Sequence, residues 1–131
     1  MRPIRVLVVD DTPHVREMLV AMLSVDGFDV VAHVADGPEA LAFCAGAGAG
    51  ADDGRAPDVV VIDYQMPGMD GLAAARQLRH AHPDLRIILY TAFADEAVER
   101  EAAAAGVAVC LAKVAGLGAL EQEISRLGSA L

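Results

Sequence analysis

A run of four β-branched residues, Val59–Ile62, constrains the fold more than any other stretch of the sequence. Pro57 precedes the run, and a Pro67-Gly68 turn follows it after a short interval. Because strands that are buried on both faces have continuous apolar sequences, this run is typical of a central strand in a parallel sheet. Asp63 follows directly, at the carboxyl end of the predicted strand, where open α/β sheets bind their ligands. The run therefore predicts a buried strand that carries a candidate functional carboxylate.

Apolar runs alternate with segments of helical period along the chain. The predicted strands are residues 4–10, 28–34, 59–62, 86–91 and 107–112. The first predicted helix begins with Thr12 as its cap and Pro13 in its first turn, and Gly27 ends it. The other predicted helices extend from Gly37 through Cys44, over residues 72–81, over residues 95–105, and from Leu117 through Leu127. Five strand-then-helix units require right-handed crossovers and a parallel sheet covered on both faces. The predicted fold is a doubly wound, three-layer α/β domain.

Composition and charge limit the classes of function. With 131 residues, 55% of them hydrophobic, the chain can bury one good core but is too short for two. A net charge of −9 offers no basic field, so direct binding to nucleic acid or to an anionic membrane is not expected. The first apolar run is too short for a signal peptide or a membrane span, which predicts a cytoplasmic protein. Cys44 and Cys110 have no CxxC spacing, so both are predicted to be reduced and buried.

Polar residues stand at the ends of four predicted strands. Asp10 and Asp11 end the first strand, Asp63 follows the third, Thr91 ends the fourth, and Lys113 follows the fifth. Any one of them alone could be a helix cap or a solvated strand end. Because the carboxyl ends of parallel strands share one edge of the sheet, however, all five should meet there. Three acids, a hydroxyl and an amine at one edge predict a functional site.

The chemistry of this set favours phosphoryl transfer. Three clustered carboxylates repel one another unless a cation holds them, and Mg²⁺ prefers oxygen ligands and bridges carboxylates to phosphate oxygens. The histidines lack the spacing of a zinc site: His14, His33, His80 and His82. A metal-bound carboxylate beside Lys113 and Thr91 is suited to accept a phosphoryl group, because the cation, the amine and the hydroxyl would offset charge on its oxygens. The predicted product is an aspartyl phosphate on Asp63.

The chain resembles the receiver domain of two-component response regulators over essentially its whole length. The matching motifs are Val8-Val9-Asp10-Asp11, Asp63 with Met66-Pro67-Gly68-Met69-Asp70-Gly71, Thr91-Ala92, and Lys113 after Gly106. The resemblance implies a flavodoxin-like fold with strand order 2-1-3-4-5. It implies that Asp63 is the phosphoacceptor and that Thr91 and Lys113 contact the phosphoryl group. It also implies that Mg²⁺ is held by Asp10, Asp11, Asp63 and the backbone carbonyl of Gln65.

The resemblance also implies partners and a role. The donor would be a histidine kinase or a phosphotransfer protein, and the signal would pass to a downstream protein or to an output domain outside this chain. Residues 1–131 are predicted to form a single receiver domain with no output domain. The domain would not be an enzyme beyond catalysing its own phosphorylation and dephosphorylation. The face formed by the fourth helix, fifth strand and fifth helix would report phosphorylation, with a phosphorylation-linked homodimer as a further option.

Three features depart from the usual receiver pattern. Cys110 stands three residues before Lys113, where most receivers have an aromatic ring that rotates on activation. Val114 replaces the usual proline after the lysine, and a trans bond is predicted there because a cis bond before a non-proline residue costs about 2.5–4 kcal/mol. The Gly/Ala-rich stretch 46–54 is longer than the usual connection and is predicted to be a surface loop. None of these features removes the acceptor or the metal ligands.

Two other functions fit part of the pattern. A phosphohydrolase of the haloacid dehalogenase type also forms an aspartyl phosphate, but it needs an acid two residues after its nucleophile. If Asp10 were that nucleophile, the acid would have to stand at position 12, where this chain has Thr12. A phosphorylation-independent interaction module with a receiver fold would usually lack the acceptor or the acid pair, and both are present here. The phosphoacceptor interpretation is therefore preferred.

Overall fold

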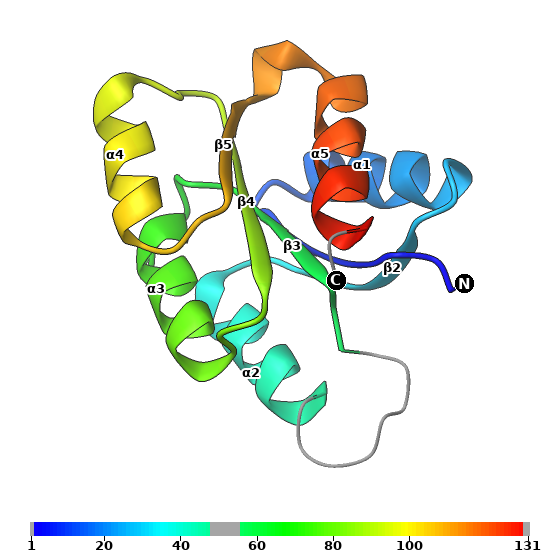
Figure 1. Ribbon diagram of the computed structural model, residues 1–131, viewed down its shortest axis with the longest axis horizontal. Coiled ribbons are helices and arrows are strands. Elements are labelled where there is room, and N and C mark those ends of the chain that lie inside the picture. Colours follow the sequence, from blue (N-terminus) through cyan, green and yellow to red (C-terminus); the bar gives the residue numbers. More distant parts are fainter. Residues whose placement is uncertain (1, 48–55, 130–131) are drawn as a thin grey trace.

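The sheet and helices match the predicted architecture. The structure is a computed structural model that describes residues 2–47 and 56–129. Over these ranges, five parallel strands form one sheet in the order β2-β1-β3-β4-β5 (Figure 1). The elements in chain order are β1 (Arg5–Val9), α1 (Pro13–Val25), β2 (Asp29–Val34), α2 (Gly37–Ala47), β3 (Val59–Ile62), α3 (Gly71–Ala81), β4 (Arg86–Thr91), α4 (Glu96–Ala104), β5 (Val109–Ala112), the short 3-10 helix η1 (Lys113–Ala115) and α5 (Leu117–Ser129). None of the described helices has the length and hydrophobicity of a membrane span. The predicted flavodoxin-like fold is confirmed.

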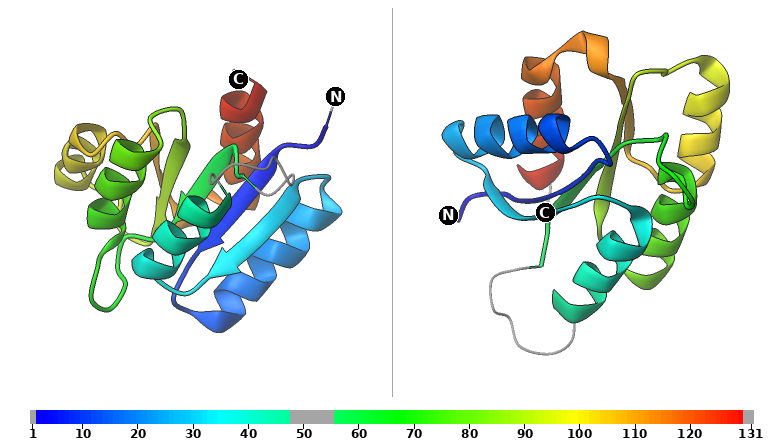
Figure 2. Two further views of the ribbon diagram at one scale, coloured as in Figure 1. Left: turned by 90° about the horizontal axis from the view of Figure 1, so that it is seen from below. Right: turned by 180° about the vertical axis from the view of Figure 1, so that it is seen from behind.

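Alternate residues of the central strands face two separate cores. On one face, Leu7 and Val60 belong to a core that is completed by α2, α3 and α4. On the other face, Val8 and Val61 pack with α1 and α5. Figure 2 shows the sheet between these two layers of helices. All four residues of β3 are buried, which confirms the predicted central strand.

The strand register places the carboxyl ends of the strands side by side. Val9 at the end of β1 pairs with Ile62 at the end of β3, and the amide of Asp63 donates to the carbonyl of Val9 at 3.0 Å. Thr91 at the end of β4 pairs with Ala112 at the end of β5. The residues that end or directly follow these strands therefore emerge together at one edge of the sheet.

Most predicted boundaries shift by one to three residues, and the shifts at the end of α2 and the start of β5 have identifiable causes. Gly46 and Ala47, predicted to begin a loop, continue α2, because an otherwise good helix sequence tolerates one glycine at a cost of about 1 kcal/mol. Residues 48–54 of that predicted loop lie outside the described residues. β5 begins at Val109 rather than at Val107, because the amide of Val107 bonds back to α4 and completes the end of that helix.

Thr12 and Cys110 also differ from their predicted roles. Thr12 occupies the N-cap position of α1, but its side chain makes no capping hydrogen bond. Its backbone amide instead donates to Oδ1 of Asp10 at 2.9 Å, so the acid fixes the turn into the helix. Both cysteines are free thiols as predicted, but only Cys44 is buried. Cys110 is half-buried because β5 is an edge strand of the sheet.

The Asp58 carboxylate links Arg2 and Arg5 at the opposite, amino-terminal edge of the sheet. Its Oδ2 atom accepts hydrogen bonds from the Arg5 amide at 2.9 Å and from Nη1 of Arg2 at 2.7 Å, and its Oδ1 atom accepts one from Nη2 of Arg2 at 2.9 Å. Burial alone would raise the pKa of the Asp58 carboxyl group. The hydrogen bonds and positive charges of Arg2 and Arg5 outweigh burial and hold this pKa below its usual value. The ionised carboxylate therefore stabilises the fold.

We expect Asp58→Asn to lower the free energy of unfolding by about 1–2 kcal/mol at neutral pH, because the amide loses the charge and one acceptor atom. Since the pKa is lowered in the folded state, the contribution of Asp58 is fully present above its unfolded value of about 3.9 and is lost as the pH falls through the folded value. The free energies of unfolding of wild type and variant, measured by urea unfolding, should therefore differ at neutral pH, and this difference should shrink below about pH 4. The exposed Asp84→Asn is the control, and equal stability of wild type and Asp58→Asn at neutral pH would contradict the expectation.

Candidate functional site

Three carboxylates converge at the carboxyl edge of the sheet. Asp10 directly follows β1, Asp11 comes next, and Asp63 directly follows β3. Each offers one carboxylate oxygen such that the three oxygens lie within 4.8 Å of one another. Asp10 is 2% exposed, whereas Asp11 and Asp63 are half-buried. A cluster of carboxylate oxygens with two partly accessible members suits a hard divalent cation.

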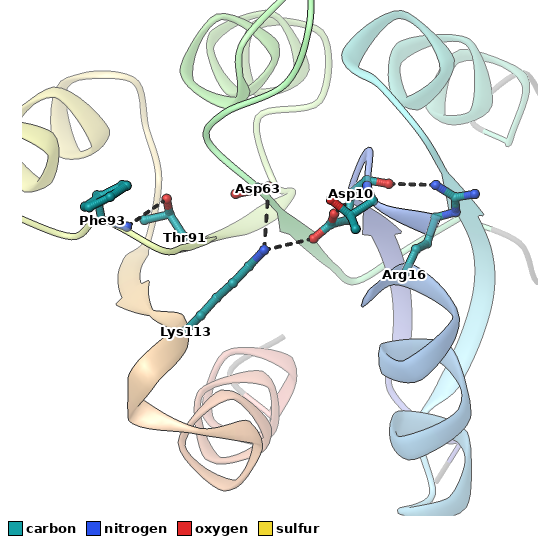
Figure 3. Close-up of polar contacts among 7 residues, drawn as sticks. Asp10, Arg16, Asp63, Thr91, Phe93 and Lys113 are labelled. Carbon is teal, nitrogen blue, oxygen red and sulfur yellow. Dashed lines mark hydrogen bonds and ion pairs between the residues drawn. The ribbon is translucent and has the colours of Figure 1, made fainter. Parts of the chain in front are cut away.

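Lys113 bridges two of these carboxylates. Its Nζ atom lies 3.1 Å from Oδ2 of Asp10 and 3.6 Å from Oδ2 of Asp63. Figure 3 shows the side chain extending from the start of η1 toward both acids. Burial alone would lower the pKa of the Lys113 amine, but the hydrogen bonds and charges of the two carboxylates outweigh burial and raise this pKa. Lys113 is therefore held as a cation beside Asp63.

The surroundings of Asp63 disfavour the ionised form of its carboxyl group and raise its pKa. Burial is the largest cause and raises the pKa of the Asp63 carboxyl group, and the charges of Asp10 and Asp11 act in the same direction. The charge of Lys113 and a hydrogen bond from the Tyr64 amide oppose this rise without reversing it. Additional positive charge at this position would therefore favour the ionised, nucleophilic form of the carboxyl group.

Thr91 ends β4, the strand next to the one that carries Asp63, and it is 1% exposed. Its Oγ1 atom accepts a hydrogen bond from the Phe93 amide at 3.3 Å (Figure 3). Of the two predicted partners of the acids, Lys113 forms ion pairs with Asp10 and Asp63. The Thr91 hydroxyl instead accepts its hydrogen bond from the loop that follows β4. Phe93 in this loop exposes 63% of its surface.

Gly71 closes the loop that runs from Asp63 to α3. The Gly71 amide donates to the Tyr64 carbonyl at 2.8 Å, and Asp70 caps α3 by accepting from the Ala73 amide at 2.8 Å. A Cβ atom on Gly71 would overlap the backbone carbonyl oxygen of Asp63. The sequence motif that follows Asp63 includes Gly71, but a motif does not show this close approach. In the sequence, the approach is indicated only by the use of glycine, a poor helix former, at the first position of a helix.

Gln65 and Val114 lie in the loops around the site. Gln65 is exposed two residues after Asp63, and the use of its backbone carbonyl as a cation ligand stays a prediction. The peptide bond between Lys113 and Val114 is trans, as predicted, because no cis peptide bond occurs in the part of the chain that the structure describes. The amine of Lys113 reaches the carboxylates with this trans bond in place.

Arg16 makes a contact that the sequence motifs do not reveal. From α1, its Nη1 atom donates to the backbone carbonyl of Asp10 at 2.8 Å (Figure 3). Because α1 begins at Pro13, Arg16 lies one turn into the helix and can reach back over the turn that follows β1. A basic residue one turn into the helix after an acid pair is the signal that could have identified it.

Comparison with known families decides the class of protein. The family model of the response regulator receiver domain matches residues 6–125. The chain belongs to this family. It is a receiver domain of the kind found in two-component response regulators, a signalling family, and the resemblance inferred from the motifs is confirmed.

Individual relatives agree with this assignment. The response regulator GacA of Pseudomonas viridiflava is 37% identical over 122 residues, which cover 92% of this chain and 53% of GacA. The receiver domain therefore spans about half the length of this relative. The signal receiver domain of response regulator NarL from Mycobacterium tuberculosis is 30% identical, with a TM-score of 0.86 and full coverage of both chains. The response regulator TrrA from Thermotoga maritima, solved in complex with Mg²⁺-BeF, is also 30% identical, with a TM-score of 0.75 over 97% of this chain and 99% of that chain. Nothing in these comparisons favours the phosphohydrolase or the phosphorylation-independent module.

Proposed function

We propose that this receiver domain accepts a phosphoryl group on Asp63, in a Mg²⁺-dependent reaction, from a histidine kinase or a phosphotransfer protein. The observation that carries the proposal is the position of the Asp63 carboxylate. It is grouped with the carboxylates of Asp10 and Asp11 and lies 3.6 Å from the Lys113 amine. A nucleophile, a set of cation ligands and a fixed positive charge are the components that phosphoryl transfer requires.

Each residue of the site would have a separate role in the transfer of the phosphoryl group. An oxygen of the Asp63 carboxylate would bond to phosphorus as the phosphorus–nitrogen bond of the donor histidine breaks, and the electron pair of that bond would leave with the imidazole. Lys113 would offset negative charge on the transferred oxygens. The Thr91 hydroxyl accepts from the Phe93 amide, so its own proton is available for donation to a phosphoryl oxygen.

The acids at the site fit a magnesium ion. Asp10, Asp11 and Asp63 present three closely spaced carboxylate oxygens, the ligand type that Mg²⁺ prefers, and the backbone carbonyl of Gln65 would add a fourth oxygen. When bound, Mg²⁺ would supply charge neutralisation for the phosphoryl oxygens. Lys113 already pairs with Asp10 and Asp63, so part of the charge in the cluster is offset by the protein itself.

The proposal extends to the setting of the domain. We infer that residues 1–131 act as one cytoplasmic receiver domain and that phosphorylation changes the surface it presents to a downstream protein or to an output domain. Self-catalysed phosphorylation and dephosphorylation would be its only reactions. The net charge of −9 supports recognition of a protein rather than direct contact with nucleic acid or an anionic membrane.

The experiment that tests the proposal follows phosphorylation by acetyl phosphate while magnesium is titrated. The wild-type domain should gain one phosphoryl group, detected by intact mass, and should gain none in excess EDTA. Asp11→Ala should require at least about tenfold more Mg²⁺ for half-maximal phosphorylation, because the variant lacks one oxygen ligand. Binding of Mg²⁺ measured by calorimetry should weaken by a similar factor.

Asp84→Ala is the matched control, because it removes an exposed acid from the turn before β4, at the other end of the sheet. It should phosphorylate at wild-type magnesium concentrations. Normal phosphorylation of Asp11→Ala at low magnesium would mean that Asp11 serves only the turn into α1. Absence of phosphorylation in the wild type would overturn the proposed function itself.

A further inference from the structure

We propose that Arg16 is a positioning residue for the cation site. Its guanidinium group holds the peptide group between Asp10 and Asp11, so that the two carboxylates keep the arrangement that a divalent cation requires. This inference rests on the proposed function, because it assigns a new residue to the same site. The four motifs described in the sequence analysis do not contain Arg16.

The first argument is the covalent geometry at the contact. Nη1 of Arg16 donates to the carbonyl oxygen of Asp10 at 2.8 Å, in partly buried surroundings. This carbonyl belongs to the peptide group whose nitrogen is that of Asp11, and the peptide group is planar. Holding this oxygen therefore restrains the rotation of the peptide plane that links the two acids.

The second argument is the set of hydrogen bonds around the same turn. The Thr12 amide donates to Oδ1 of Asp10 at 2.9 Å, and the Arg16 amide donates to the Thr12 carbonyl at 2.9 Å. The side chain of Arg16 adds the bond that returns from α1 to the Asp10 backbone. The Asp10 amide also donates to the Val34 carbonyl at 3.1 Å, so the side chain, the amide and the carbonyl of Asp10 are all held, and Arg16 is the residue that holds the carbonyl.

The third argument is the direction of each contact. Figure 3 shows the Asp10 carboxylate directed toward Lys113 and Asp63, while the Asp10 carbonyl is directed toward Arg16 on the other side. The guanidinium group therefore does not occupy the space between the carboxylates and does not replace the cation there. It acts on the site through the backbone of Asp10.

A buried nitrogen of Arg16 that lacks a hydrogen-bond partner indicates that this residue does more than stabilise the fold. Its Nε atom is buried and has no hydrogen-bond partner among the described residues. An unpaired buried donor is destabilising, so an apolar side chain would serve packing at least as well. The bond to the Asp10 carbonyl is what an apolar residue could not provide.

The test measures Mg²⁺ binding by calorimetry, without a phosphodonor, for wild type and three variants. Arg16→Met keeps an apolar stem but cannot donate, and its Kd for Mg²⁺ should rise about tenfold, as expected when a group that orients metal ligands is lost. Arg16→Lys can still donate one bond and should stay within about threefold of wild type. Arg100→Met, which removes the same charge from a 73% exposed side chain in α4, should bind Mg²⁺ as wild type does.

Phosphorylation by acetyl phosphate provides the second readout. For Arg16→Met, the rate should fall about tenfold at low Mg²⁺ and return close to the wild-type rate at saturating Mg²⁺, because cation binding and not the acceptor is impaired. A merely structural anchor would lower the thermal midpoint without this dependence on magnesium.

The outcomes separate the two proposals. A wild-type Kd for Arg16→Met, or an equal loss in Arg100→Met, would overturn the role of Arg16 while the proposed function stands. If Arg16→Met does not fold, Arg16→Lys and Arg16→Gln replace it; Kd should then increase from wild type through Lys to Gln, and unchanged values would overturn the inference. A wild-type domain that neither binds Mg²⁺ nor becomes phosphorylated would refute the proposed function instead.

Discussion

Asp63→Asn is expected to abolish phosphorylation of the domain. An amide cannot form the acyl phosphate, and Asp63 is the acid of the cluster that follows the central strand β3 and lies within 3.6 Å of the Lys113 amine. The rate should fall at least about 10³-fold, below detection by intact mass. The variant should fold at least as well as wild type, because the substitution removes one of three clustered negative charges.

The control for this variant is Asp70→Asn, which changes an acid of the same loop. Asp70 caps α3 through a hydrogen bond that an asparagine side chain can also accept, so both folding and phosphorylation should persist. Borohydride trapping followed by peptide mass spectrometry should locate the modification of the wild type at Asp63. A phosphoryl group on another residue, or one retained in Asp63→Asn, would disprove the assignment.

Gly71→Ala is expected to lower the free energy of unfolding by about 3 kcal/mol, the upper range for overpacking of a tightly packed position. The added Cβ atom would overlap the Asp63 carbonyl oxygen, and it would approach Cα of Tyr64 to 3.0 Å. These are backbone atoms, so no side-chain rotation can relieve the overlap. For a chain of this size the midpoint of thermal unfolding should fall by roughly 10 °C.

Gly118→Ala provides a matched control at the second position of α5. A Cβ atom there would meet nothing within 4 Å, and alanine is the better helix former, so stability should rise by about 0.5–1 kcal/mol. Urea unfolding measures both effects. Folded Gly71→Ala should also phosphorylate slowly, because the displaced backbone is that of Asp63. Equal stability of Gly71→Ala and wild type would show that the loop can shift without cost.

Much of the fold can be predicted from local sequence patterns. The continuous apolar run Val59–Ile62 predicts the central buried strand, and the five strand-and-helix units predict a doubly wound parallel sheet; both are observed. The same topology predicts that Asp10, Asp63 and Lys113 meet at one edge, and the structure brings them within ion-pair distance. These predictions succeed because buried surface and chain direction are expressed in residue periodicity, which a sequence displays directly.

The tertiary structure decided the contacts that periodicity does not contain. The approach of Gly71 to the Asp63 carbonyl, the bond from Arg16 to the Asp10 carbonyl and the half-buried position of Cys110 each depend on how separate segments pack. A sequence pattern specifies which face of an element is buried, but not the distance between a side chain and a backbone atom of another segment. Residue identities along the chain therefore determined the architecture and the edge that carries the site, whereas packing in three dimensions determined which neighbours hold its acids in place.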